Sequence, residues 1–133
     1  MDITWVSTDQ DREARDRLLA RAGLAADGDV TRSVLLYDGD MAVGTASRKD
    51  NVLKWFAINP SYQGQGLVGV LLTPLVTDAI ASGISRLFFV TKPGNVVLFR
   101  SFGFFLIAET SRMALMENRK DGLSSKWSLR LLS

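Results

Sequence analysis

The pattern of hydrophobic and polar positions changes twice in the middle of the chain. Residues 52–58 are mostly apolar and rich in β-branched and aromatic side chains, and they stop at Asn59-Pro60, where proline disfavours helical backbone in the preceding residue. From Leu67 onward, apolar positions recur with helical spacing. A glycine-rich turn lies between the two segments. The pattern therefore predicts a strand, a turn and a helix in succession.

The rest of the chain divides into short strands and helices by the same criteria. Alternation of apolar and polar residues indicates strands, and apolar residues at helical spacing indicate helices. Gly, Asp-Gly and Thr-Asp mark where elements begin or end. The expected elements are a strand at 3–6, a helix at 9–22 capped by Thr8, hairpin strands at 31–37 and 41–48, the central strand at 52–58, a helix at about 66–82 containing Pro74, a strand at 86–91, a short helix at about 95–102, and strands at 104–108 and 112–116.

The strand at 86–91 is expected beside the central strand. Its residues 87–90 form a continuous apolar run, typical of a strand buried on both faces. Because a helix joins it to the strand at 52–58, the usual right-handed crossover makes the two strands parallel. Pro74 removes one hydrogen bond from that helix and should kink it. The pattern thus predicts an α/β (α+β) fold with a mixed central sheet and the order β-α-β-β-β-α-β-α-β-β.

Composition narrows the chemistry. With 133 residues, 47% of them hydrophobic, the chain is long enough for one domain with a single core. It contains no His and no Cys, which excludes imidazole bases, thiol nucleophiles, disulfides and most transition-metal sites. No apolar segment is long enough to cross a membrane, and no signal-peptide pattern begins the chain. We therefore expect a soluble cytoplasmic protein without a metal.

Charge adds one indication. The net charge of +2 does not by itself require a nucleic-acid or acidic partner. Residues 1–50 carry ten acids and seven bases, whereas residues 51–133 carry four acids and nine bases. The basic second half suits an anionic ligand, although ordinary surface variation would give the same distribution.

The glycine-rich turn is the first candidate site. Gly64 and Gly66 let the backbone approach a partner closely, and the first amides of the following helix have no partner within the helix and lie at its positive end. Such a turn is suited to a phosphate group. It has neither the Gly-Lys-Ser/Thr ending of P-loops nor the spacing of dinucleotide-binding folds. A turn without a ligand is the alternative interpretation.

The segment Tyr62-Gln63-Gly64-Gln65-Gly66-Leu67-Val68 resembles the Arg/Gln-x-x-Gly-x-Gly/Ala signature of the GCN5-related N-acetyltransferase (GNAT) superfamily. Val68 stands where that family has its second small residue. The resemblance implies acetyl-CoA or CoA as cofactor, with its pyrophosphate on the loop amides and its pantetheine arm in a V-shaped cleft between the two central parallel strands. The cofactor-binding residues that it implies are Phe56, Ala57, Ile58, Gln63, Gly64, Gln65, Gly66, Leu67, Val68, Thr91 and Phe99.

The same family indicates where a catalytic acid would lie. Leu98-Phe99-Arg100-Ser101-Phe102-Gly103-Phe104 is similar to its Leu-Tyr-x-x-x-Gly-Phe segment, in which the tyrosine often protonates the leaving CoA thiolate. Phe99 occupies the tyrosine position and has no hydroxyl group. The family's asparagine, seven residues earlier, is Lys92 here, and Asn95 is out of register.

A general base is not evident either. The central strand has no glutamate, and a base must lie within hydrogen-bond reach of the group that it deprotonates. The nearest acidic candidates, Asp40, Asp50 and Glu109, are more typical of turns and surfaces. No catalytic residue is assigned.

Three further segments, 87–92, 98–100 and 113–118, together with the glycine loop, resemble the N-terminal acetyltransferase-like domain of citrate lyase ligase, the [citrate (pro-3S)-lyase] ligase, over most of residues 35–120. That family uses ATP and acetate to acetylate the thiol of citrate lyase's prosthetic group. The resemblance implies a CoA-like prosthetic arm on the citrate lyase carrier subunit as ligand. It also implies a nucleotidyltransferase domain that follows in the family and whose motifs this sequence lacks.

The resemblance suggests two regions and three functions. Residues 1–118 form the acyl-CoA-binding domain, and residues 119–133 are a linker or the start of a helix leading to the missing domain, or else a helix that packs back on the sheet. The chain is a recognition domain of the ligase, a free-standing acetyl-CoA-dependent N-acetyltransferase of unknown acceptor, or a structural domain with a non-binding loop. A retained loop without an acid or base favours recognition.

Overall fold

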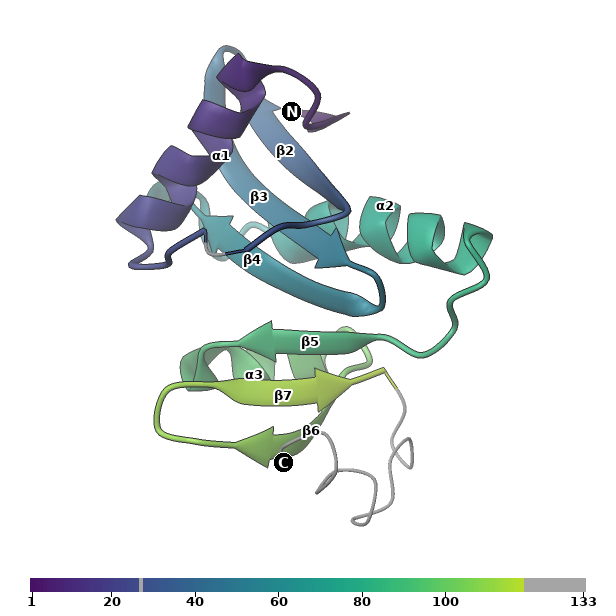
Figure 1. Cartoon of the computed structure of the whole chain (residues 1–133). Coiled ribbons are helices and arrows are strands. Elements are labelled where there is room, and N and C mark those ends of the chain that lie inside the picture. Colours follow the sequence, from purple (N-terminus) through teal and green to yellow (C-terminus); the bar gives the residue numbers. More distant parts are fainter. Residues whose placement is uncertain (27, 119–133) are drawn as a thin grey trace.

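The computed structural model describes residues 1–26 and 28–118 of the chain. The predicted element order is confirmed, with two short 3-10 turns added (Figure 1). The predicted linker or helix at 119–133 lies outside the described residues. In chain order the elements are β1 Asp2–Trp5, α1 Asp9–Arg21, β2 Arg32–Asp38, β3 Met41–Lys49, β4 Val52–Ile58, η1 Pro60–Tyr62, α2 Leu67–Ala81, β5 Phe88–Thr91, η2 Pro93–Asn95, α3 Val96–Arg100, β6 Phe105–Glu109 and β7 Ala114–Glu117.

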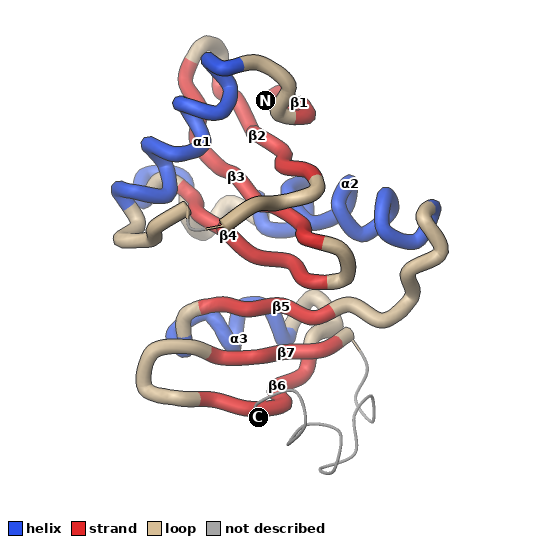
Figure 2. Tube along the Cα trace, viewed as in Figure 1, coloured by secondary structure: helices blue, strands red, loops and turns tan. Residues whose placement is uncertain are grey.

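The strands form one mixed sheet in the order β1-β2-β3-β4-β5-β7-β6. The meander β2-β3-β4 is antiparallel, as the hairpin signals predict, and β5 lies parallel to β4 through the α2 crossover. The two edges of the sheet are β1 and β6 (Figure 2). The parallel pair β4-β5 is therefore in the interior of the sheet, where the predicted cleft would lie.

Helices cover the two faces unequally. On one face α1 packs over β3 and β4, and a small apolar cluster that includes Leu19, Leu35 and Ala57 fills the space between them. On the other face α2 and α3 lie behind the sheet (Figure 1), over a larger cluster that includes Leu71 and Phe89. The result is three layers, with the sheet in the middle.

The start of α1 follows from local hydrogen bonds. The Thr8 hydroxyl accepts a hydrogen bond from the Asp11 amide at 3.0 Å, and the Asp11 carboxylate accepts one from the Thr8 amide at 3.3 Å. This reciprocal pair is a capping box, which satisfies two backbone donors at the start of the helix. The predicted Thr8 cap is thus confirmed.

All elements except β4 differ from the predicted bounds by one or two residues, and β5 and the helix after it are the clearest cases. β5 begins at Phe88 rather than at residue 86. The predicted helix at 95–102 is split into a 3-10 turn at Pro93–Asn95 and the shorter α3, because Pro93 fixes the backbone at the start and the Asn95 amide donates to the Lys92 carbonyl at 3.0 Å. Pro74 lies within α2, which continues on both sides of it.

A β-bulge in β4 was not predicted. The register with β3 passes from Thr45↔Ala57 to Ser47↔Lys54, so β4 has one extra residue there. Within it, Trp55 has a φ of 56°, a left-handed conformation that is uncommon for a bulky side chain. Pairing with β5 stops at Leu53↔Phe89, immediately before the bulge. Because bulges bend the strand that contains them, we infer that this one turns β4 away from β5.

Within the part of the chain that the structure describes, no helix is long and apolar enough to cross a membrane.

Candidate functional site

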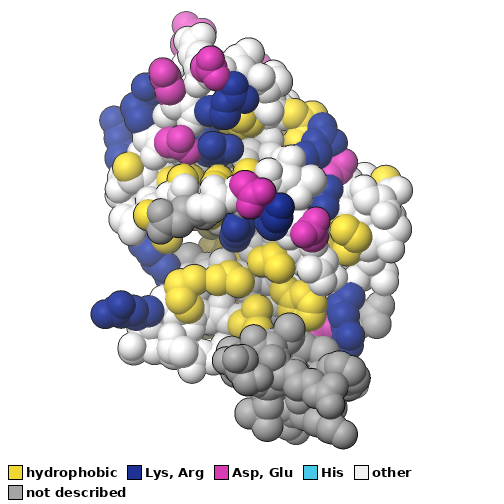
Figure 3. Space-filling model, in the orientation of Figure 1, with side chains coloured by type: hydrophobic (Ala, Val, Ile, Leu, Met, Phe, Trp, Pro, Cys, Tyr) yellow, Lys and Arg dark blue, Asp and Glu magenta, His cyan; other side chains and the backbone are white. Residues whose placement is uncertain are grey.

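A cleft opens between β4 and β5 beyond their last paired residues, as the fold prediction requires. Its volume is about 920 Å³, within the usual range for small-molecule sites. In the space-filling view, hydrophobic side chains gather below the hollow, over β5 and β7, and basic side chains lie near the end of α1 (Figure 3). The cleft lining includes Leu18, Arg21, Ala22, Leu24, Ala25, Lys54, Trp55, Phe56, Ala57, Ile58, Tyr62, Gln63, Gly64, Gly66, Leu67, Val68, Val90, Thr91, Lys92 and Leu98.

One wall of the cleft is the edge of β4 at residues 54–58. Lys54, Ala57 and Ile58 pair with β3 on one side. On the other side β5 gives none of residues 54–58 a partner, since the parallel register contains only Val52↔Phe88 and Leu53↔Phe89. Backbone groups on such an edge need water or a ligand to satisfy them. An extended chain with amide groups fits this wall.

The glycine loop closes one end of the cleft. Gly64 and Gly66 have φ values of 80° and 73°, which glycine adopts without strain. A Cβ built on either would meet no heavy atom within 4 Å, so the space above both is open. Gly66 is the N-cap of α2 and provides no side-chain hydrogen bond.

Among the described residues, no hydrogen bond uses the amides of Gly64, Gln65 or Gly66. The first amides of α2 also lack intrahelical partners, as in every helix. Several donors are therefore available at the positive end of a 15-residue helix, which suits a phosphate or pyrophosphate.

Two contacts hold the start of the loop. The Asn59 side chain accepts a hydrogen bond from the Ser61 amide at 3.0 Å, and the Tyr62 hydroxyl donates to the Asp38 carboxylate at 2.5 Å. The second contact ties the loop to the β2-β3 turn. It also raises the pKa of the Tyr62 phenol, chiefly because the neutral phenol donates this hydrogen bond.

Nine of the eleven residues that the resemblance implies line the cleft. The exceptions are Gln65, which is exposed outside the lining, and Phe99, which is fully buried. The Phe99 ring centroid lies 4.9 Å from that of Phe56 and 4.0 Å from that of Phe89, so it is part of an aromatic core cluster. Val68, at the family's second small position, is 5% exposed and packs into the same core while contributing to the cleft wall.

Sequence reasoning missed the other end of the cleft. Leu18, Arg21, Ala22, Leu24 and Ala25, from the end of α1 and the loop after it, all line it. They precede the glycine loop by roughly 40 residues, and no spacing in the sequence connects them to it. Only the position of α1 over β4 brings them there.

The cleft lining is basic. Arg21, Lys54 and Lys92 belong to it, whereas no Asp or Glu of the described residues does. The Lys92 ammonium donates to the Ala22 carbonyl at the end of α1 and so spans the mouth of the cleft. Of the acidic candidates, Asp40, Asp50 and Glu109 are exposed and lie outside the lining.

Comparison with known families agrees with this geometry. Residues 2–104 match the model of the acetyltransferase (GNAT) family, which covers more than half of the chain. The chain belongs to the GNAT family. The predicted resemblance to that superfamily is confirmed.

Two solved structures share the fold of this chain. FeeM, an N-acyl amino acid synthase from uncultured soil microbes, superposes with a TM-score of 0.72 at 15% identity over 87% of this chain and 88% of its own. N-acetylglutamate synthase from Neisseria gonorrhoeae, solved with coenzyme A and L-arginine, gives a TM-score of 0.69 at 16% identity over 88% of this chain and 33% of its own. At these identities the likeness concerns the fold alone.

The GNAT domain also resembles a curated protein in sequence. It is 42% identical over 114 residues to [citrate [pro-3S]-lyase] ligase of Klebsiella pneumoniae, a match that covers 85% of this chain. The chain spans 33% of that protein's length. The resemblance to citrate lyase ligase is confirmed for this region.

Proposed function

We propose that this GNAT domain is the recognition domain of a citrate lyase ligase, and that it binds CoA, acetyl-CoA or the CoA-like prosthetic arm of citrate lyase. The observation that carries the proposal is the open glycine loop at the start of α2, joined to a cleft whose β4 edge lacks a strand partner. The glycine loop is suited to a pyrophosphate, and the unpaired edge of β4 is suited to a chain of amides.

In this proposal the loop amides of residues 64–68 bind the pyrophosphate. The pantetheine arm lies between β4 and β5, where its amides hydrogen-bond the free edge at residues 54–58 and Thr91 lines the opposite wall. Phe99 acts from beneath, because it packs against the ring of Phe56, which faces the cleft.

Recognition is favoured over catalysis by what lines the cleft. Proton transfer needs a positioned acid or base, and the described lining contains no carboxylate, while position 99 holds a buried phenylalanine. The ATP chemistry would belong to a nucleotidyltransferase domain beyond this one. The citrate lyase carrier subunit would present the prosthetic arm.

Calorimetric titration with CoA, acetyl-CoA and dephospho-CoA tests the proposal. Gly66→Asp places a carboxylate where the pyrophosphate would lie, and we expect CoA affinity to fall at least roughly 100-fold through charge repulsion and loss of the close approach. Gly83→Asp is the matched control, because Gly83 also has a left-handed φ, of 85°, and open space around its Cβ position, but lies at the other end of α2. Equal affinities in the two variants would refute the loop assignment.

A free-standing N-acetyltransferase is the second candidate, supported by the match to the acetyltransferase family. It requires release of CoA from acetyl-CoA that depends on an added amine. A protein that binds none of the three CoA compounds would leave the third candidate, a structural domain.

A further inference from the structure

We propose that the α1-side end of the cleft is a carboxylate site formed by Arg21, Lys54 and Lys92. The proposal rests on the proposed function, since the CoA-type arm would carry its reacting end away from the glycine loop toward this end. It adds the chemical class of the group that the cleft receives there.

The three basic residues come from three separate elements. Arg21 is the last residue of α1, Lys54 lies at the bulge of β4, and Lys92 follows β5. All three line the same cleft, and none forms an ion pair with another described residue. Three positive charges therefore share one mouth without a neutralising carboxylate in the described lining.

The bulge explains the position of Lys54. Leu53 and Phe56 both pack toward the α2 face, while Trp55 and Ala57 pack toward α1, so the extra residue places Lys54 and Trp55 together on the α1 side. The Lys54 ammonium lies 5.3 Å from the centroid of the Trp55 ring. This cation-π contact orients the ammonium and leaves its hydrogen-bond donors available.

Lys92 is held at the opposite side of the mouth. Its ammonium donates one hydrogen bond to the Ala22 carbonyl, and it lies 3.7 Å from the position that a Cβ on Gly23 would take. An ammonium has three donors, so two remain for a ligand. The contact also brings Lys92 beside the last turn of α1, which carries Arg21.

This arrangement favours a negatively charged ligand over a positively charged one. A protonated amine would meet three cations, whereas a carboxylate would meet charged donors from two sides of the mouth, beside the apolar side chains of Leu18 and Leu24. Hydrogen bonds to charged groups are stronger than those between neutral groups. The expected occupant is a short carboxylate, either at the end of an acyl chain on the CoA-type arm or as a separate small acid.

A pair of thioesters of similar length tests this. Calorimetry should show succinyl-CoA binding roughly tenfold more tightly than butyryl-CoA, because only the first carries a carboxylate. Lys54→Met and Arg21→Met should each bring the ratio of succinyl-CoA to butyryl-CoA affinity close to one. Arg17→Met is the matched control, since Arg17 also lies on α1 but not in the lining, and it should keep the preference.

Succinate titrated into the CoA-saturated protein distinguishes the two sources of the carboxylate. Binding of succinate that is lost in Lys54→Met indicates a separate acid, whereas a preference confined to succinyl-CoA indicates an acyl carboxylate. Suppose that acetyl-CoA binds, that succinyl-CoA binds no more tightly than butyryl-CoA, and that succinate does not bind. The carboxylate site is then refuted and the proposed function stands.

If no CoA compound binds, the proposed function fails, and nuclear magnetic resonance with succinate alone decides the site. Amide shift changes at Arg21, Lys54 and Lys92 that disappear in Lys54→Met would support it. Unchanged spectra would refute it.

Discussion

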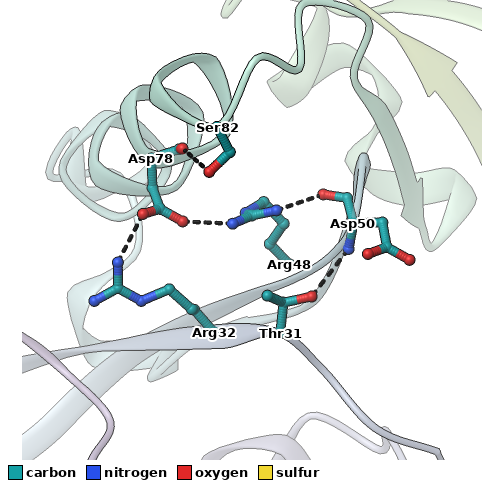
Figure 4. A network of polar contacts seen from close by, with 6 residues as sticks. All are labelled: Thr31, Arg32, Arg48, Asp50, Asp78 and Ser82. Carbon is teal, nitrogen blue, oxygen red and sulfur yellow. Dashed lines mark hydrogen bonds and ion pairs between the residues drawn. The ribbon is translucent and has the colours of Figure 1, made fainter.

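The two ends of α2 differ in how their polar groups are satisfied. Near the C-terminal end, the Asp78 carboxylate accepts hydrogen bonds from Arg32 at 2.6 Å and from Arg48 at 2.5 Å, and Arg48 also donates to the Asp50 carbonyl at 2.8 Å (Figure 4). At the N-terminal end, Gly66 provides no side-chain cap and the loop amides find no partner among the described residues.

The difference separates stability from binding. Polar networks in partly buried positions hold elements together, here α2 to the β2-β3-β4 meander. We call this the closed end, although the buried Arg48 Nε has no partner among the described residues. Open donors at a helix start contribute little to folding and remain available for an anion. Substitutions at the two ends should therefore change different measurements.

The largest effect on stability is expected at the closed end. Asp78→Asn leaves the Arg48 guanidinium, whose side chain is 5% exposed, without its carboxylate partner, and the free energy of unfolding should fall by about 3 kcal/mol. Urea denaturation measures this, and CoA affinity should stay within about twofold of wild type. Asp16→Asn, at an exposed position of α1, is the control. A large loss of CoA affinity in Asp78→Asn would contradict the separation of the two ends.

The core beneath the cleft should respond more moderately. Phe99→Tyr adds a hydroxyl within the fully buried cluster of Phe56 and Phe89, and burial of an unpaired hydroxyl should cost roughly 2 kcal/mol. We expect no amine-dependent release of CoA from acetyl-CoA, because the position lies outside the cleft lining. A gain of that activity would instead indicate that only the acid is missing, and would favour the N-acetyltransferase.

Acid should lower the free energy of unfolding by a smaller amount, since only part of the molecules have Asp78 protonated as the pH falls toward its lowered pKa. The pKa of Asp78 is lowered from its usual 3.8, chiefly because Arg48 donates a hydrogen bond to the carboxylate. Its contribution to stability is therefore complete above pH 3.8 and is lost as the pH falls toward the lowered value. As the pH is lowered through this range, the free energy of unfolding should fall less steeply for Asp78→Asn than for wild type. The same pH dependence in both proteins would show that Asp78 is not the cause of the acid sensitivity.

The smallest effect is expected for Ser82→Ala. The Ser82 hydroxyl donates to the Asp78 carbonyl at 2.9 Å, but it is exposed at the end of the helix (Figure 4). The free energy of unfolding should change by less than about 0.5 kcal/mol, as measured in urea. A much larger loss would show that the backbone of Asp78, and not only its carboxylate, is part of the network.

The elements around the loop were predictable because their signals are local. The bounds of β4 at Val52–Ile58 agree with the prediction, since the apolar run and Asn59-Pro60 define both ends within a few residues. The glycine loop, the start of α2 and the parallel placement of β5 follow from glycine, helical spacing and crossover handedness. None of these requires knowledge of distant contacts.

Other features of the site depend on contacts between distant residues. The bulge at Trp55 arises from the β3-β4 register, and burial of Phe99 depends on the rings of Phe56 and Phe89 meeting over the sheet. Lys92 reaches the end of α1, 70 residues earlier in the chain, only because α1 packs over β4. Periodicity and turn residues identify which segments form the cleft, whereas the packing of helices on a bent sheet decides which side chains line it.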